Sequence, residues 1–385
     1  MRILHIISST NPQSGGPIEV IRQLAGVLAQ QGCSTEVACV DAPQAQWLTA
    51  LPFKVYALGP GRTRYNYAPL FWSWLKEHAP QYNAVIVHGL WQYTGFATRW
   101  ALRGTSTPYF VFTHGMLDPW FKRTYPLKHL QKWVFWLAGE YWLVREARAV
   151  LFTCEQERIL ARKSFWLYRC NEAVVNAGIT PITGDPQQQQ QVFFARFPEL
   201  RGKRLLLFLS RIHVKKGCDL LLEAFARVAA RDQHLHLVMA GPDQMGWQAR
   251  LQVQAQRLGI AERVTWTGMI TAEVKWGAFR AAEAFVLPSH QENFGIAVVE
   301  ALACGTPVLI SDKVNVWYEI AQDGAGFVGP DTVMGTVETL ERWLTLPAAS
   351  RQMMKQKAEQ CFAQHFEVHQ AAQNLLAVLG PPPEH

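Results

Sequence analysis

The sequence predicts an α/β protein made of two doubly wound domains that face each other across a cleft. Three observations support this fold class. A chain of 385 residues is longer than a single hydrophobic core usually grows, which is roughly 250–300 residues. Short apolar runs bounded by turn residues alternate with segments of helical periodicity. A polar, breaker-rich stretch, Thr180–Gln191, interrupts this alternation near the middle of the chain, and we expect a hinge there.

Two series of apolar runs are expected to form two parallel sheets, each beginning with a strand that leads into a helix. The first series is Arg2–Ser8, Thr35–Val40, Phe53–Leu58, Ala84–His88, Tyr109–Thr113, Ala149–Phe152 and Ala173–Val175. The second is Arg204–Ser210, His236–Ala240, Val264–Trp266, Ala284–Leu287 and Pro307–Ile310. The opening helices are expected at Pro17–Gln31 and Cys218–Ala230. We therefore expect a first domain at 1–178, a linker that does not pack at 179–203, a second domain at 204–365, and at 366–385 a helix packing back toward the first domain and a Pro-rich tail.

Composition narrows the classes of function. Hydrophobic residues make up 49% of the chain and charged residues 17%, which excludes global disorder. The net charge of +7 is uneven: residues 1–178 carry 18 basic and 10 acidic side chains, a net of +8, and the remainder 19 and 20, a net of −1. The basic half contains no recognisable nucleic-acid recognition module, so we expect no nucleic-acid partner.

Cysteine usage and hydropathy predict a cytoplasmic protein. The 7 Cys are scattered without a C-x-x-C pair, which is typical of reduced thiols. The apolar run Ile3–Ile7 is too short for a signal peptide. No segment approaches the roughly 18 apolar residues of a membrane span. We therefore expect a soluble protein that is at most peripheral at the inner face of a membrane.

Candidate ligand-binding residues follow the expected strands, where parallel sheets bind ligands. After the first strand, Gly15 and Gly16 precede Pro17, which suits the first turn of a helix. The bare backbone there lets an anion approach, although Gly-Gly-Pro is also a common turn. After the first strand of the second series come Arg211 and Lys216, a donor fork and a compact charge that suit a diphosphate. A solvated basic loop is the alternative.

The most specific motif follows Leu287-Pro288 and pairs two carboxylates, Glu292 on a loop and Glu300 about one turn inside a helix. Between them, Asn293, Phe294, Gly295 and Ile296 place backbone amides at a positive helix end. A side chain in place of Gly295 would block that approach. Core packing explains Val298 and Val299 of the same segment, but not two acids that flank an Asn-Phe-Gly turn.

These motifs together resemble the retaining glycosyltransferases of family four, also called glycosyl transferases group 1. The resemblance covers nearly the whole chain and includes the turn Ala303–Pro307. It implies the GT-B fold of two Rossmann-like domains, with the acceptor side first and the nucleotide-sugar side second. It also implies that Arg211 and Lys216 hold the donor diphosphate, Glu292 the transferred sugar and Glu300 the ribose. Further donor contacts implied are Gly15, Gly16, Gly241, Met269 and Ile270.

Two histidines at strand ends are candidates for the first domain. His88 and His114 both follow apolar runs and precede glycine, which places two imidazoles at one rim of the domain. The resemblance places His114 beside the reacting sugar; a structural histidine is the alternative for each. Asp118 is either an acceptor-side contact or, as we favour, a turn carboxylate.

The expected reaction is transfer of a hexose-type sugar from a nucleotide diphosphate sugar, UDP- or GDP-linked, to a saccharide or lipid-linked acceptor. No D-x-D motif occurs, so we expect no metal and no cofactor, with leaving-group charge met by Arg211, Lys216 and helix-end amides. Retention by front-face displacement is favoured over a glycosyl-enzyme on Glu292. The alternatives are a nucleotide-sugar epimerase of the same architecture and a non-catalytic nucleotide-sugar-binding module.

The segment Trp120–Arg148 interleaves basic and aromatic side chains, among them Lys128, Lys132, Trp133 and Trp136. This pattern is typical of a surface that contacts anionic lipid. A lipid-linked acceptor at the cytoplasmic leaflet is then expected, in polysaccharide or glycolipid synthesis. A buried helix with a charged outer side is the alternative.

Overall fold

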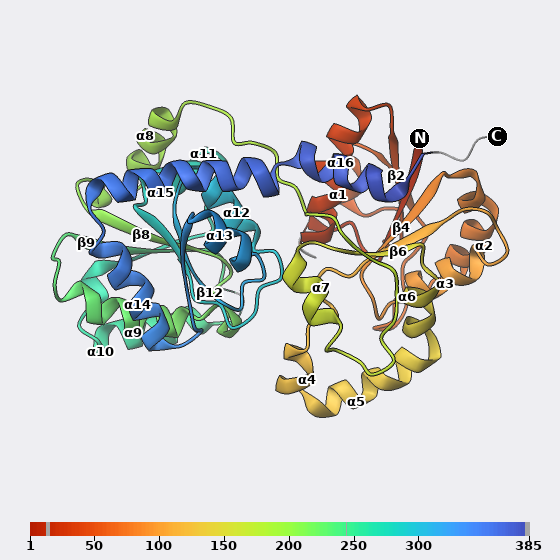
Figure 1. The fold of residues 1–385 in the computed structure, drawn as a ribbon, viewed down its shortest axis with the longest axis horizontal. Helices are drawn as coiled ribbons and strands as arrows, with labels where there is room; N and C mark the ends of the chain where they lie inside the picture. Colours follow the sequence, from red (N-terminus) through yellow and green to blue (C-terminus); the bar gives the residue numbers. More distant parts are fainter. Residues whose placement is uncertain (13–15, 244, 382–385) are drawn as a thin grey trace. The chain divides into compact units, whose positions relative to one another are not determined.

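A computed structural model describes residues 1–12, 16–243 and 245–381 of the chain. Within them the chain forms two compact units. Unit 1 consists of Met1–Thr180 and the segment from Val368 onward, and unit 2 consists of Pro181–Glu367. Each unit has its own parallel sheet, with helices packed on its faces (Figure 1). The prediction of two Rossmann-like α/β halves is confirmed.

The described part of unit 1 has a seven-stranded sheet in the order β3-β2-β1-β4-β5-β6-β7, with every pair parallel. Its strands are β1 (Arg2–Ile7), β2 (Ser34–Cys39), β3 (Lys54–Ala57), β4 (Ala84–His88), β5 (Tyr109–Phe112), β6 (Ala149–Phe152) and β7 (Glu172–Val174). Its α-helices are α1 (Gly16–Gln30), α2 (Pro69–His78), α3 (Tyr93–Ala101), α4 (Trp120–Thr124), α5 (Pro126–Phe135), α6 (Tyr141–Glu146), α7 (Glu155–Ala161) and α16 (Val368–Leu379). All residues of β4 and β5 are buried, because helices cover both faces of a parallel sheet and its strands are therefore continuously apolar.

The described part of unit 2 has a six-stranded parallel sheet in the order β10-β9-β8-β11-β12-β13. Its strands are β8 (Arg204–Leu209), β9 (Leu235–Ala240), β10 (Val264–Gly268), β11 (Ala284–Leu287), β12 (Val308–Ser311) and β13 (Gly326–Gly329). Its α-helices are α8 (Pro186–Arg196), α9 (Cys218–Ala229), α10 (Trp247–Arg257), α11 (Ala272–Ala281), α12 (Ile296–Ala303), α13 (Trp317–Asp323), α14 (Val333–Leu344) and α15 (Ala348–Cys361). Strand β13, which pairs with β12, was not predicted from the sequence.

The expectation that the Gln-rich stretch does not pack is wrong. Its glutamines lie in α8, which begins after the capping side chain of Asp185 and packs on α11. Gln189 and Phe193 are each 1% exposed. A Cβ at Gly277 of α11 would lie 2.1 Å from the Gln189 carbonyl oxygen, so the two helices approach closely only because this residue is glycine.

Helix α16 packs against α1 in unit 1 (Figure 1). It buries one apolar face, formed by Val368, Ala371, Ala372, Leu375 and Leu379. The backbone N–H of Val368 donates to the carbonyl of Ile179 at 3.1 Å. Unit 1 is therefore built from both ends of the chain.

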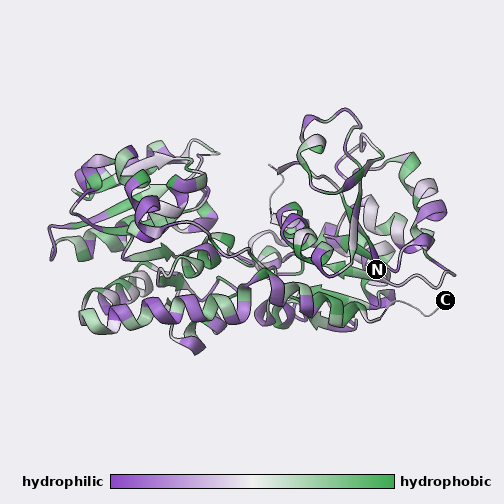
Figure 2. Ribbon diagram, turned by 90° about the horizontal axis from the view of Figure 1, so that it is seen from above, coloured by the Kyte–Doolittle hydropathy of each residue, from purple (hydrophilic) through white to green (hydrophobic). Residues whose placement is uncertain are grey.

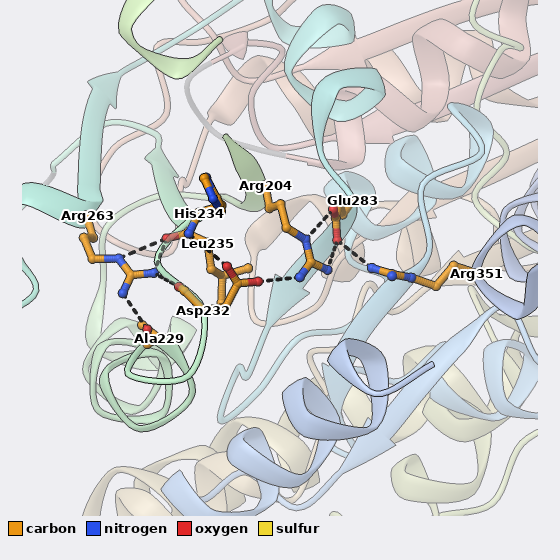
Figure 3. A network of polar contacts seen from close by, with 8 residues as sticks. All are labelled: Arg204, Ala229, Asp232, His234, Leu235, Arg263, Glu283 and Arg351. Atoms are coloured by element: carbon orange, nitrogen blue, oxygen red, sulfur yellow. Dashed lines mark hydrogen bonds and ion pairs between the residues drawn. The ribbon is translucent and has the colours of Figure 1, made fainter. Parts of the chain in front are cut away.

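An ion-pair network closes the amino-terminal edge of the unit 2 sheet (Figure 3). The guanidinium of Arg204 donates two 2.8 Å hydrogen bonds to Glu283 and also pairs with Asp232. Arg351 of α15 donates to the same Glu283 carboxylate at 3.2 Å. Because Arg204 begins β8 and Glu283 precedes β11, this network lies at the edge opposite to the carboxyl ends of the strands.

The hydropathy of the chain follows the layers of the fold. Figure 2 shows hydrophobic strands inside and hydrophilic residues along the helices.

Candidate functional site

The candidate site of unit 2 lies where its strand order reverses. From β8 the chain continues to β9 on one side, whereas β11 pairs with β8 on the other side. The loops that follow β8 and β11 diverge from this point, which is where open parallel sheets bind ligands. Arg211 follows β8, and Glu292 follows β11.

A glycine allows these two loops to approach each other closely. Gly217, at the start of α9, has a φ of +65°, and a Cβ there would lie 2.1 Å from the carbonyl oxygen of Pro288. The carbonyl of Lys215 accepts hydrogen bonds from the His290 N–H at 2.8 Å and the Ser289 hydroxyl at 3.1 Å. The basic loop is therefore fastened to the loop that carries Glu292.

Two residues predicted from separate motifs meet in this loop pair. The Nζ of Lys216 forms an ion pair with the carboxylate of Glu292. Lys216 is only 8% exposed, while Arg211 is exposed at the same edge of the sheet. The backbone of Glu292 is bonded on both sides, since its N–H donates to Lys313 at 2.9 Å and its carbonyl accepts from Asn315 at 3.0 Å. The backbone of Glu292 is therefore fixed, and its carboxylate is paired with one lysine.

The amino-terminal end of α12 lies between the two predicted carboxylates. Gly295 precedes the helix with a φ of +70°, and the Asn293 Oδ1 accepts from the Asn315 amide at 3.3 Å. Phe294 is 6% exposed and packs edge-on against Phe366. Its side chain therefore belongs to the core, which leaves only its backbone for a ligand, while Ile296 is half-buried as the first residue of α12.

Glu300 of α12 is held by a residue that the sequence analysis missed. Lys275 of α11 donates from Nζ to Glu300 Oε1 at 2.7 Å, and the Glu300 side chain is 12% exposed. A lysine on a different helix gives no local sequence signal for this pairing. Both predicted carboxylates thus have a lysine partner.

The remaining donor-side candidates lie after β9 and β10. Gly241 has a φ of +140°, and a Cβ there would lie 1.8 Å from the Ser210 carbonyl oxygen, so chain packing alone requires glycine. Its N–H donates to Gly268 at 2.9 Å. Met269 is 71% exposed and Ile270 is half-buried.

In unit 1 the strand order reverses between β1 and β4, and three histidines lie there in a row. His5 Nδ1 is 2.8 Å from His88 Nε2, and His88 Nδ1 is 2.9 Å from His114 Nε2. His88 is 5% exposed, and both of its ring nitrogens are engaged by imidazoles. This leaves His88 no nitrogen for a ligand, whereas His114, with a φ of +48°, is half-buried at the end of the row.

A buried carboxylate that the sequence analysis missed supports the His114 loop. Glu157 of α7 is 3% exposed. It accepts from the Thr113 hydroxyl at 2.7 Å, the Gly115 N–H at 2.5 Å and the Thr153 N–H at 2.7 Å. It therefore joins the ends of β5 and β6 and fixes the residues on both sides of His114.

The other unit 1 candidates differ in what the structure places around them. Asp118 accepts from the Trp120 N–H at 2.7 Å, the bond of a turn carboxylate at the start of α4. Gly16 is the first residue of α1, and Gly15 lies outside the described residues. Asp41, which was not predicted, accepts from the Thr10 N–H and hydroxyl at 2.7 and 2.8 Å and so fixes the loop after β1.

Helix α5 lies at the periphery of unit 1 (Figure 1), and it exposes apolar side chains. Leu127, Leu130 and Val134 are 80%, 67% and 68% exposed, and His129 is the buried residue of the helix. The expected alternative of a buried helix with core aromatics holds in part. Trp133 of α5 packs against the core and Trp136 is fully buried, whereas the three apolar side chains named above are exposed.

Within residues 1–12, 16–243 and 245–381, no helix is long and apolar enough to cross a membrane. No group of three or more His, Cys, Asp or Glu side chains is placed to hold a metal ion in that part of the chain.

Comparison with known proteins gives two family matches, one for each half of the sequence. Residues 15–177 match the glycosyl transferase 4-like domain, and residues 189–361 match the glycosyl transferases group 1. Anabaena HepE, solved in complex with UDP, is similar with a TM-score of 0.79 and 18% identity over 97% of this chain and 98% of that one. This likeness concerns the fold.

Curated relatives match over shorter stretches. The D-inositol 3-phosphate glycosyltransferase of Geodermatophilus obscurus is 41% identical over 112 residues, which are 27% of this chain and 25% of the relative. The alpha-monoglucosyldiacylglycerol synthase of Streptococcus pneumoniae is 32% identical over 175 residues, 43% of this chain and 37% of the relative. The chain therefore spans less than half of the length of either relative.

Proposed function

We infer that this chain, which belongs to the GT-B glycosyltransferases, transfers a hexose-type sugar from a nucleotide diphosphate sugar to an acceptor. The observation that carries the inference is the pairing of Lys216 with Glu292 at the strand reversal of unit 2, where Arg211 also follows β8. A carboxylate fixed next to cations suits a ligand that has sugar hydroxyls at one end and a diphosphate at the other.

The leaving diphosphate would gain negative charge as the bond to the sugar breaks. Arg211 and Lys216 would offset this charge, together with the amides at the start of α12. We propose that these groups suffice without a metal ion. In the proposed step the acceptor oxygen bonds to the anomeric carbon on the face that the phosphate leaves, and the phosphate oxygen takes the acceptor proton. Glu292 would hold sugar hydroxyls, so the product would retain the donor configuration, which NMR of the product would test.

The donor is proposed to be UDP-linked. Support comes from Anabaena HepE, whose structures were solved with UDP and with UDP-glucose. The test is thermal unfolding with UDP, GDP or ADP, in which a bound nucleotide raises the melting temperature. We expect UDP to give the largest increase and the Lys216→Met variant to lose it. Equal, negligible shifts with all three nucleotides would contradict the donor site.

The acceptor is proposed to be lipid-linked and presented at an anionic membrane surface. The exposed face of α5 supports this, because the helix exposes three apolar side chains together with Lys128, and the preceding helix α4 exposes Lys122. An amphipathic helix of this composition binds in the interfacial region of a bilayer.

The alternative activity is that of a nucleotide-sugar epimerase. Exchange of a sugar proton with solvent in the absence of acceptor would favour this alternative over sugar transfer.

A further inference from the structure

The row of three histidines in unit 1 runs from the core to the edge of the sheet. His5 lies within β1 and is 1% exposed, His88 ends β4 and is 5% exposed, and His114 follows β5 and is half-buried. The nitrogen–nitrogen distances of 2.8 and 2.9 Å are those of hydrogen bonds. Neighbouring rings are inclined by only 29° and 19°, and Phe112 stacks on His88 and His114. The rings are thus held as one rigid series.

All three imidazoles are neutral at pH 7. Burial lowers the pKa of His5 to about 3 and that of His114 to about 4. Burial, with His5 and His114 on either side, also lowers the pKa of His88 well below its ordinary value. Each ring therefore carries a single N–H.

Counting protons leaves two arrangements of the row. Each of the two contacts needs one N–H, and His88 has only one to give. In the first arrangement His5 donates to His88 and His88 donates to His114, so all three rings are protonated on Nδ1. In the second arrangement both bonds run the other way, and all three rings are protonated on Nε2. A change of tautomer in one ring would therefore require the same change in the other two, with both hydrogen bonds reversed.

The buried end of the row distinguishes the two arrangements. His5 Nε2 is buried and has no hydrogen-bond partner among the described residues. The second arrangement would place an N–H there without an acceptor, and orphaned buried N–H groups are rarer than orphaned acceptors. The first arrangement leaves only a lone pair at this atom. It also gives His114 an N–H at the nitrogen that is not engaged by His88.

We propose that His5 and His88 are positioning residues that hold His114 in the Nδ1–H form, so that His114 presents a hydrogen-bond donor rather than a base to an oxygen of a ligand bound at this edge of the unit 1 sheet. The identity of the ligand rests on the proposed function. The protonation of the row does not, because it can be measured in the free protein.

The direct test is ¹⁵N NMR of the histidine rings in the ligand-free enzyme at pH 7. The two nitrogens of a neutral imidazole resonate far apart, so the spectrum shows which one carries the proton. We expect Nδ1–H at His5, His88 and His114. Nε2–H at these three residues would overturn the proposal.

His236 in unit 2 provides an internal reference with the opposite tautomer. Lys203 Nζ is 3.4 Å from His236 Nδ1, and His236 Nε2 is 2.9 Å from the Thr265 hydroxyl. Because an ammonium group can only donate, His236 must accept on Nδ1. Burial lowers its pKa to about 4, so it is neutral and carries its proton on Nε2. The same spectrum should therefore contain both tautomers.

A matched pair of variants tests whether the row controls His114. The amide nitrogen of Asn can take the place of His Nδ1, so His5→Asn keeps the donor to His88, whereas His5→Leu removes it. We expect His5→Leu to show mixed tautomers at His114 and a kcat reduced roughly tenfold, the effect of one misplaced hydrogen bond, with little change in KM for the donor. We expect His5→Asn to retain the Nδ1–H form and most of the kcat.

If both His5 variants lost the same kcat while the tautomer of His114 stayed unchanged, the row would have only a structural role. This result would overturn the proposal. Failure of the wild-type protein to transfer sugar would count against the proposed function alone, since the wild-type tautomers would stand.

Discussion

Arg211 is an exposed cation that, in the proposed reaction, offsets the negative charge of the leaving diphosphate. It is exposed and lies between β8 and α9, as does Lys216, the partner of Glu292. Replacing Arg211 by Met should lower kcat by about 10²–10³, the usual effect of losing one preorganised charge-stabilising donor. Steady-state kinetics with a UDP-sugar would measure this loss.

The matched control for Arg211 is Arg231→Met, which removes a surface partner of Glu341 in the same unit. This variant should keep wild-type kinetics. An Arg211 variant within a few-fold of wild type would contradict the assigned role, and a rate lost to EDTA and restored only by Mg²⁺ would contradict metal independence.

The sequence predicted several site residues individually, but not their contacts. Lys216 and Glu292 follow strands, so their common edge could be predicted, whereas their direct ion pair depends on two loops that are far apart in sequence. His5 was missed because it lies inside an apolar strand. A lone imidazole among Ile and Leu residues was nevertheless a signal, since a buried polar group requires a partner.

Loop conformation in unit 2 depends on glycines that begin helices, and two of them form a matched pair. Gly217 and Gly246 have φ values of +65° and +67° and precede α9 and α10. A Cβ would lie 2.1 Å from Pro288 O at Gly217, whereas at Gly246 it would meet none of the described residues within 4 Å.

We expect Gly246→Ala to cost about 1–2 kcal/mol, the strain of a left-handed residue alone. Gly217→Ala should cost more and should also weaken nucleotide binding, because the loops of Lys216 and Glu292 must move apart. Urea unfolding and UDP-dependent melting would measure the two effects. Equal losses of stability at both positions would show that the close approach to Pro288 does not matter.

The network at the amino-terminal edge of the unit 2 sheet makes stability depend on pH. Burial alone would raise the pKa of Glu283, but the hydrogen bonds and charge of Arg204, with Arg351, outweigh burial and hold the pKa below its ordinary value of 4.5. A depressed carboxyl pKa stabilises the fold above the unfolded-state value, and this stability is lost as the pH falls through the folded-state value.

We therefore expect Glu283→Gln to lower the free energy of unfolding at neutral pH and to converge with the wild type on acidification below the ordinary carboxyl pKa. Denaturant unfolding at several pH values would measure this convergence. A difference between the two proteins that stays constant with pH would contradict the charge-based explanation.

Most strands could be predicted from the sequence, whereas strand β13 and helix α8 could not. Buried parallel strands are continuous apolar runs, as in β4 and β8, and periodicity finds them. The short β13 contains only Gly326–Gly329 and is specified by pairing with β12. Helix α8 has almost no apolar periodicity, and its buried Gln189 is satisfied by Thr183 and Arg280, which are tertiary contacts.

At the scale of the whole molecule, the excess positive charge of residues 1–178 accompanies the exposed face of α5. We expect the protein to float with anionic vesicles at low salt. Replacing Leu127, Leu130 and Val134 by Ser should weaken this binding about tenfold or more, because each exposed apolar side chain contributes when it enters the interface.

The control for the vesicle experiment is a set of exposed apolar residues in unit 2. Replacing Val253, Leu258 and Met353 by Ser should leave flotation unchanged. No flotation of the wild-type protein at moderate salt would remove the membrane proposal and leave the donor site of unit 2 unaffected.

The return of α16 to α1 determines the order in which the two units can be completed during translation. The ribosome makes most of unit 1 first, yet the side of α1 that contacts α16 has to wait for Val368, Leu375 and their neighbours, which emerge after all of unit 2. The half that is begun first is thus finished last, and a nascent chain stalled before residue 368 would carry a finished unit 2 beside an unfinished unit 1.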